Sequence, residues 1–121
     1  MTNYVSTRWY RAPECLLSSR NYGKPADVFA LGCIFAEFIK LKPLFNGESS
    51  LDQLRKYCAV LGSPSEEDWP EGHLLSEQGS VKLPDVIGTG LANVLPEVSF
   101  EALDLMMKML QLNPDKRPTM K

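Results

Sequence analysis

The chain carries few side chains that could perform covalent or metal chemistry by themselves. His73 is the only histidine, so a Ser/His or Cys/His nucleophilic pair has little material, and a histidine-rich metal site has none. The three cysteines, Cys15, Cys33 and Cys58, are far apart, and none belongs to a Cys-x-x-Cys pair. We therefore expect reduced, buried thiols in a cytosolic or nuclear protein, rather than a disulfide framework or a zinc site.

Two runs near opposite ends of the chain carry the most specific motifs. They read STRWYRAPEC at residues 6–15 and LQLNPDKRPT at residues 110–119. In this order they resemble the end of the activation segment and the closing Arg-Pro signature of a eukaryotic protein kinase domain. The resemblance implies that the Glu14 carboxylate and the Arg117 guanidinium form a buried ion pair.

The implied ion pair has a defined geometry. Arg117 precedes Pro118, which biases its backbone toward an extended conformation. Its planar guanidinium could then donate two hydrogen bonds of roughly 2.7–2.9 Å to the Glu14 carboxylate. We expect both side chains to be buried beside the first turns of a helix that begins near Pro25. The alternative interpretation is two unrelated surface charges.

The same resemblance assigns roles to five residues at the N-terminus. In mitogen-activated protein kinases and their relatives, the positions matching Thr2 and Tyr4 are phosphorylated to switch the enzyme on. Each phosphate adds a charge of roughly −1.5 to −2, and Arg8 and Arg11 are its implied guanidinium partners. Thr7 would lie in the substrate-positioning loop and favours serine/threonine specificity. The alternatives are an exposed tail with solvated arginines and an ordinary loop threonine.

A third run, DVFALGC at residues 27–33, resembles the family motif Asp-Val-Trp-Ser/Ala-x-Gly-Cys, with Phe29 in place of the tryptophan. The resemblance implies that Asp27 holds the backbone of the catalytic loop. The alternative is an acidic residue at a helix N-terminus, which the helix dipole favours by about 0.3–1 kcal/mol. Gly32 costs about 1 kcal/mol relative to alanine within a helix, which indicates close packing there.

Further motifs favour the CMGC group, which includes the cyclin-dependent and mitogen-activated kinases. PLFNG at residues 43–47 and VLGSP at 60–64 resemble features of this group. DWPEG at 68–72 is most similar to the male-germ-cell-associated (RCK-type) kinases. By this resemblance, residues 1–121 are a partial kinase domain from the C-terminal, helical lobe, incomplete at both ends. Residues 62–97 would be the insertion of the group, a usual docking surface for partners.

The resemblance implies a parent kinase that transfers the γ-phosphate of ATP, with Mg²⁺, to serine or threonine of protein substrates, where proline follows. An upstream kinase would activate it. Only Met1 to Val5 precede the first signature, so the glycine-rich loop, nucleotide lysine, catalytic aspartate and magnesium ligands are missing. We expect the chain alone to bind neither ATP nor Mg²⁺ and to be inactive. The alternatives are a docking or regulatory module derived from a kinase, and an unrelated helical interaction domain.

The hydrophobic pattern predicts a mostly α-helical chain without strands. Ala12 to Leu17 should form one short helical turn. Residues 25–39 read as a helix that is apolar on every side except at Asp27 and Glu37. Such a helix is buried all round, yet a chain of 121 residues can cover it only poorly. The natural domain should therefore be larger.

Two further helices are expected. Ser50 to Gln53 fit a capping box at the start of a helix that Gly62 stops. Ser99 can cap the last helix, which Asn113 would end. The buried stripe expected along the last helix consists of Phe100, Leu103, Met107 and Leu110.

The region between these two helices, residues 63–97, is rich in glycine, proline and acidic residues. Its hydrophobic residues, such as Trp69, are isolated. We expect an irregular surface segment with short helical turns, and His73 in a loop on the surface.

Charge and hydropathy exclude several functional classes. Thirteen basic residues and 15 acidic residues give a net charge of −2, without a basic cluster for nucleic acid. The longest apolar run, Val28 to Ala36, is about half the length of a membrane span. No charged and then apolar leader begins the chain. We therefore expect a soluble protein of the cytoplasm or nucleus.

Overall fold

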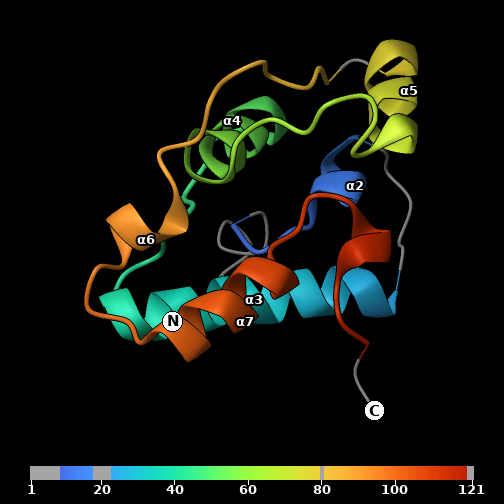
Figure 1. The fold of residues 1–121 in the computed structure, drawn as a ribbon. Coiled ribbons are helices and arrows are strands. Elements are labelled where there is room, and N and C mark those ends of the chain that lie inside the picture. Colours follow the sequence, from blue (N-terminus) through green and yellow to red (C-terminus); the bar gives the residue numbers. More distant parts are fainter. Residues whose placement is uncertain (1–8, 18–22, 80, 120–121) are drawn as a thin grey trace.

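The protein is mostly helical, as the sequence predicts. A computed structural model describes residues 9–17, 23–79 and 81–119, and among these residues there are helices and loops but no strand (Figure 1). The helices are α2 (Pro13–Leu17), α3 (Lys24–Lys40), α4 (Ser50–Leu61), α5 (Pro70–Gln78), α6 (Leu91–Val94), α7 (Phe100–Met109) and the 3₁₀ helix η1 (Pro114–Lys116).

The long helix α3 is the base of the fold, and α7 lies along it (Figure 1). It begins after Gly23, with Pro25 in its first turn, and ends at Leu41, whose φ of 63° is left-handed. Gly32 lets the chain after α7 approach closely, because a Cβ at this position would lie 3.0 Å from the Leu110 side chain. The close packing expected at Gly32 is confirmed.

Helix α3 is buried on one side only, which confirms the expectation that this chain covers the apolar helix poorly. Phe29, Cys33 and Ala36 face the core and are at most 2% exposed. A row at helical spacing on the other side is open to solvent, and we call it the apolar row. It consists of Leu31, Ile34, Phe38 and Leu41, which are 42%, 49%, 79% and 87% exposed.

Helix α4 begins differently from the prediction. Ser49, not Ser50, is the N-cap, and its Oγ accepts a hydrogen bond from the Asp52 backbone N–H at 3.0 Å. Gln53 is not the outer member of a capping box, because its side chain is fully buried. The helix ends at Gly62, as expected.

An aromatic cluster joins α3 and α4. The Tyr57 ring packs edge-on against Phe29 and Phe45, with ring centroids 4.8 and 4.9 Å apart. Aromatic pairs of this geometry contribute about 0.5–1.5 kcal/mol beyond the area they bury. The cluster fixes the side of α4 that faces α3.

Residues 63–97 are more ordered than the sequence indicates. Helix α5 has nine residues and contains His73, whose Nε2 lies 2.9 Å from the Pro64 carbonyl oxygen, so the loop predicted there is wrong. Trp69 is 2% exposed. A Cβ at Gly72 would come within 2.2 Å of the Trp69 ring, so glycine is what allows α5 to pack on this indole.

The last helix has its predicted cap and a different buried face. Ser99 Oγ accepts a hydrogen bond from the Ala102 backbone N–H, as expected. Phe100 and Met107 are exposed, whereas Met106 and Met109 are buried. The predicted stripe is therefore half right, because Leu110 lies in the core and Leu103 packs against it, whereas Phe100 and Met107 do not.

Among the described residues, none of the helices combines the length and apolar composition that a membrane crossing requires.

The apolar row predicts that the isolated chain self-associates, since uncovered contiguous apolar surface promotes association. Phe38→Lys should keep the chain monomeric at higher concentration, measured by light scattering. Phe100→Lys is the matched control, because Phe100 is equally exposed (78%) but lies outside the row. A wild-type monomer that unfolds cooperatively and shows dispersed amide signals would contradict this expectation.

Candidate functional site

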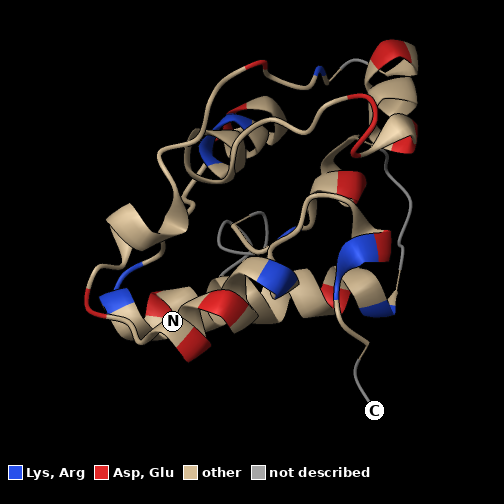
Figure 2. Cartoon of the chain, in the orientation of Figure 1, with Lys and Arg blue, Asp and Glu red and all other residues tan. Residues whose placement is uncertain are grey.

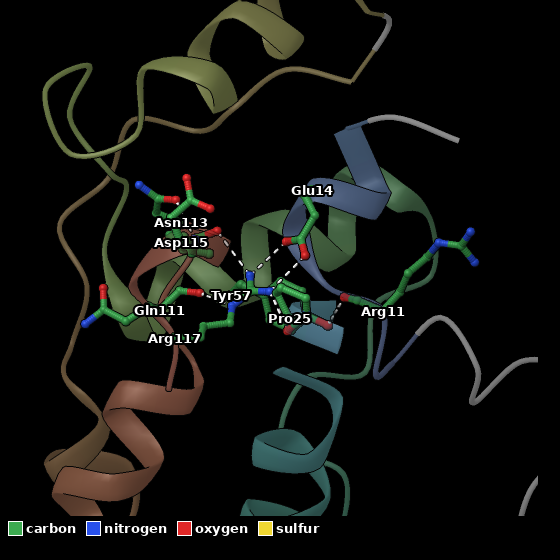
Figure 3. Close-up of polar contacts among 9 residues, drawn as sticks. Arg11, Glu14, Pro25, Tyr57, Gln111, Asn113, Asp115 and Arg117 are labelled. Carbon is green, nitrogen blue, oxygen red and sulfur yellow. Dashed lines mark hydrogen bonds and ion pairs between the residues drawn. The ribbon is translucent and has the colours of Figure 1, made fainter. Parts of the chain in front are cut away.

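The candidate site is the segment Trp9 to Glu14 together with the groups of α3, α4 and the C-terminal segment that hold it. Four of the predicted site residues, Thr2, Tyr4, Thr7 and Arg8, lie outside the described residues. Arg11 is exposed, and its guanidinium points away from the Glu14–Arg117 pair (Figure 3).

The structure brings Glu14 and Arg117 together across almost the whole chain (Figure 3). The Arg117 Nη1 and Nη2 groups donate to Oε2 and Oε1 of Glu14, both at 2.8 Å. Glu14 is 1% exposed and Arg117 is 6% exposed. The contact is therefore a buried, bidentate ion pair between α2 and the loop after η1.

The other donors of the guanidinium are also satisfied. Arg117 Nε donates to the Gln111 carbonyl oxygen at 2.7 Å, and Nη1 donates to that of Pro25 at 2.8 Å. Nη2 makes a longer contact of 3.2 Å with the Leu112 carbonyl oxygen. The guanidinium carbon also lies 4.9 Å from the centre of the Phe29 ring, a cation–π contact. One side chain thus fixes α2, the start of α3 and the end of α7 relative to one another.

Asp27 does not join this pair. It lies in the first turn of α3 with an exposed side chain, where a carboxylate is favoured by the helix dipole.

Gln53 is a site residue that the sequence interpretation missed. Its side-chain Oε1 accepts from the Gly47 backbone N–H at 2.7 Å. Its Nε2 donates to the carbonyl oxygens of Phe45 at 2.8 Å and Trp9 at 3.2 Å. A polar residue next to a helix start looks like a cap in sequence, so only the fold reveals that it faces inward.

Tyr57 is the second missed residue. Its hydroxyl donates to the Arg11 carbonyl oxygen at 2.6 Å. Burial raises the pKa of Tyr57 well above its ordinary value, so this donor stays protonated. The spacing of Tyr57 from Leu54 and Cys58 on one helical face could have indicated burial, but not the partner.

The thiols are buried as predicted. Cys15, Cys33 and Cys58 are each buried. Burial raises the pKa of the Cys33 and Cys58 thiols. Because the thiolate is the nucleophilic form, neither cysteine has the electrostatic setting of a catalytic nucleophile.

The arrangement holds the backbone of Trp9 and Arg11 and presents the exposed Arg11 guanidinium. Within the described part of the chain, no three His, Cys, Asp or Glu side chains are grouped as metal ligands. Lysine and arginine are spread over α3, α4, α7 and η1, and each of these helices also carries aspartate or glutamate (Figure 2).

Comparison with known proteins gives one consistent result. The family model for the protein kinase domain matches residues 1–121. Serine/threonine-protein kinase ICK of Rattus norvegicus is 52% identical over 118 residues, 98% of this chain and 19% of the relative. Serine/threonine-protein kinase MAK of Homo sapiens is 49% identical, with the same coverage. Cyclin-dependent kinase F-4 of Oryza sativa is 49% identical over 97% of this chain and 26% of the relative. The chain spans about a fifth of the length of the first two relatives.

The buried pair predicts strong coupling between the ends of the chain. In the intact kinase domain, Glu14→Gln and Arg117→Met should each lower the free energy of unfolding by about 3–5 kcal/mol, because each strands a buried charge or donor. The double variant should cost clearly less than the sum of the two. The control is the exposed pair Asp104–Lys108 (2.9 Å), whose removal should cost at most about 0.5 kcal/mol. Additive effects at Glu14 and Arg117 would contradict the pairing.

The Tyr10 hydroxyl, hydrogen-bonded to the Glu37 carboxylate, predicts a pH dependence at alkaline pH. Burial and this carboxylate raise the pKa of Tyr10 to about 12. Because the folded-state pKa lies above the unfolded value of about 10, the contact stabilises the fold below pH 10. This stability is lost as the pH rises through about 12.

The measurement is the free energy of unfolding as a function of pH. The wild type should lose more stability over this alkaline range than Tyr10→Phe. Tyr57 is present in both proteins, so its own titration cancels. Equal slopes would show that the Tyr10–Glu37 contact does not exist in solution.

Proposed function

The chain belongs to the protein kinase domain family, and from this premise we propose that it is the C-terminal, helical-lobe portion of a CMGC-group serine/threonine kinase. The intact enzyme, the parent kinase, transfers the γ-phosphate of ATP to serine or threonine, with a preference for a following proline. The observation that carries the proposal is the bidentate Glu14–Arg117 pair, which joins two kinase signatures 103 residues apart.

The proposed task of these residues is to shape the place where the protein substrate binds. Residues 6–11, called the substrate loop below, contain Thr7, which positions the target hydroxyl near the catalytic aspartate. Phosphate groups on Thr2 and Tyr4, added by an upstream kinase, would pair with Arg8 and Arg11. The exposed Arg11 side chain supports this assignment, because a phosphate needs an accessible guanidinium.

The residues that the structure describes offer no site that fits Mg²⁺ and ATP. Magnesium in kinases needs oxygen ligands that also reach the nucleotide phosphates, and the described residues contain no group of three carboxylates or other metal ligands. Binding of ATP and Mg²⁺ would therefore belong to other parts of the parent kinase, and the chain alone should be inactive.

A docking or regulatory module is the second candidate, and one feature of residues 62–97 favours it. A cavity of about 280 Å³ lies where this segment meets α4 and α7. Its lining includes the apolar residues Leu61, Leu91 and Met107 and the charged residues Asp68 and Lys116. A partner protein could dock there whether or not catalysis takes place. Such partners, and a location in the cytoplasm or nucleus, are part of this proposal.

The decisive experiment begins with the transcript. An in-frame sequence upstream of Met1 that encodes His-Arg-Asp and Asp-Phe-Gly would supply the missing catalytic groups, and its absence would favour the docking module.

The parent kinase should phosphorylate a Ser-Pro peptide and act more slowly on the matched Ser-Ala peptide. The isolated 121-residue chain should show no magnesium-dependent ATP binding by calorimetry. ATP binding by the isolated chain would overturn the assignment.

A further inference from the structure

We propose that Gln53 and Tyr57 are positioning residues that clamp the substrate loop by holding the backbone carbonyls of Trp9 and Arg11. This inference rests on the proposed kinase function and adds two residues to it. Both side chains come from one face of α4, four residues apart, so they approach the loop as one rigid unit.

The Gln53 amide is held so tightly that it can act as a fixed point. It is fully buried, and both ends of the amide are engaged, since Oε1 accepts from Gly47 and Nε2 donates to Phe45 and Trp9. If the Trp9 carbonyl moved away, the buried Nε2 of Gln53 would lose one of its two acceptors, which costs free energy.

Trp9 is held a second time, through its side chain. Its indole Nε1 donates to the Gly47 carbonyl oxygen at 3.0 Å. Only glycine fits at position 47, because a Cβ there would lie 2.5 Å from the Gln53 backbone. Gly47 therefore bonds Gln53 through its N–H and Trp9 through its carbonyl group, which closes a ring of hydrogen bonds among the three residues.

Tyr57 holds the loop two residues further along. Its hydroxyl donates to the Arg11 carbonyl oxygen at 2.6 Å and makes a longer contact of 3.4 Å with that of Trp9, and its ring packs edge-on against Phe29 and Phe45. Trp9 and Arg11 therefore cannot shift independently of α4.

The clamp sits immediately after the residues assigned to substrate recognition. Arg8 is bonded directly to Trp9, and Thr7 precedes it by one residue. A fixed anchor reduces the entropy that the loop loses when a peptide binds, and it keeps the target hydroxyl in register. Weakening the clamp should therefore impair binding of the protein substrate and leave ATP binding unchanged.

The test uses Tyr57→Phe and Gln53→Met in the parent kinase. Tyr57→Phe keeps the ring and removes only the hydroxyl, and Gln53→Met keeps the shape and removes the amide. Each should raise KM for the Ser-Pro peptide about fivefold, the effect of one lost hydrogen bond, with KM for ATP unchanged. Trypsin should also cleave faster after Arg11 in both variants.

The matched control is Ser49→Ala, which removes the cap of the same helix without touching Trp9 or Arg11. It should lower the thermal midpoint by a comparable amount and leave the peptide KM and the cleavage rate unchanged. If all three variants change KM alike, the effect is one of stability and the proposal is wrong.

Failure of the clamp and failure of the kinase assignment give different results. An active wild type whose variants keep the wild-type peptide KM would overturn the positioning role alone. An inactive wild type would overturn the kinase function and the positioning role with it. Cleavage after Arg11 would then still report whether the side chains hold the loop.

Discussion

The buried guanidinium of Arg117 is the constraint on which the rest of the structure depends. A charge taken out of water is tolerated only when a counter-charge and hydrogen-bond acceptors surround it. Here the acceptors are Glu14 and the carbonyl groups of Pro25, Gln111 and Leu112. These groups belong to segments far apart in sequence, so they must converge before the charge can be buried. The pair therefore specifies the arrangement of α2, α3 and the C-terminal segment more than it adds net stability.

Helix α4 connects the two regions to which the proposed function assigns partners. Side chains on one side of α4 hold Trp9 and Arg11 of the substrate loop, whereas the C-terminal end of α4 binds the segment before α6. That segment is bound through its backbone, because the amides of Thr89 and Gly90 donate to the Ala59 and Val60 carbonyl oxygens at 2.9 and 2.8 Å. A displacement of α4 would therefore shift both the substrate loop and residues 62–97.

Sequence reasoning succeeded where a pattern was local or where two signatures had to meet. Helical periodicity predicted α3, α4 and α7, and the two end motifs predicted which carboxylate faces Arg117. It failed where a neighbouring element decides the outcome. Gln53 resembles a capping residue in its own helix, yet the loop at Gly47 supplies a partner that turns it inward. The stripe through Phe100 and Met107 is valid helical spacing, but α3 packs against the adjacent face.

In the described residues, the buried polar side chains all have hydrogen-bond partners, but several large apolar side chains remain exposed. Among the described residues, no buried side-chain nitrogen or oxygen atom lacks a hydrogen-bond partner. In contrast, Phe38 and Leu41 expose most of their side-chain surface beside a core that is tightly packed around Phe29. Polar contacts are directional and select one arrangement, whereas apolar burial is non-directional and contributes most of the stability. The polar network can therefore define the architecture of these residues, whereas the outer side of α3 carries apolar surface that the described residues leave exposed.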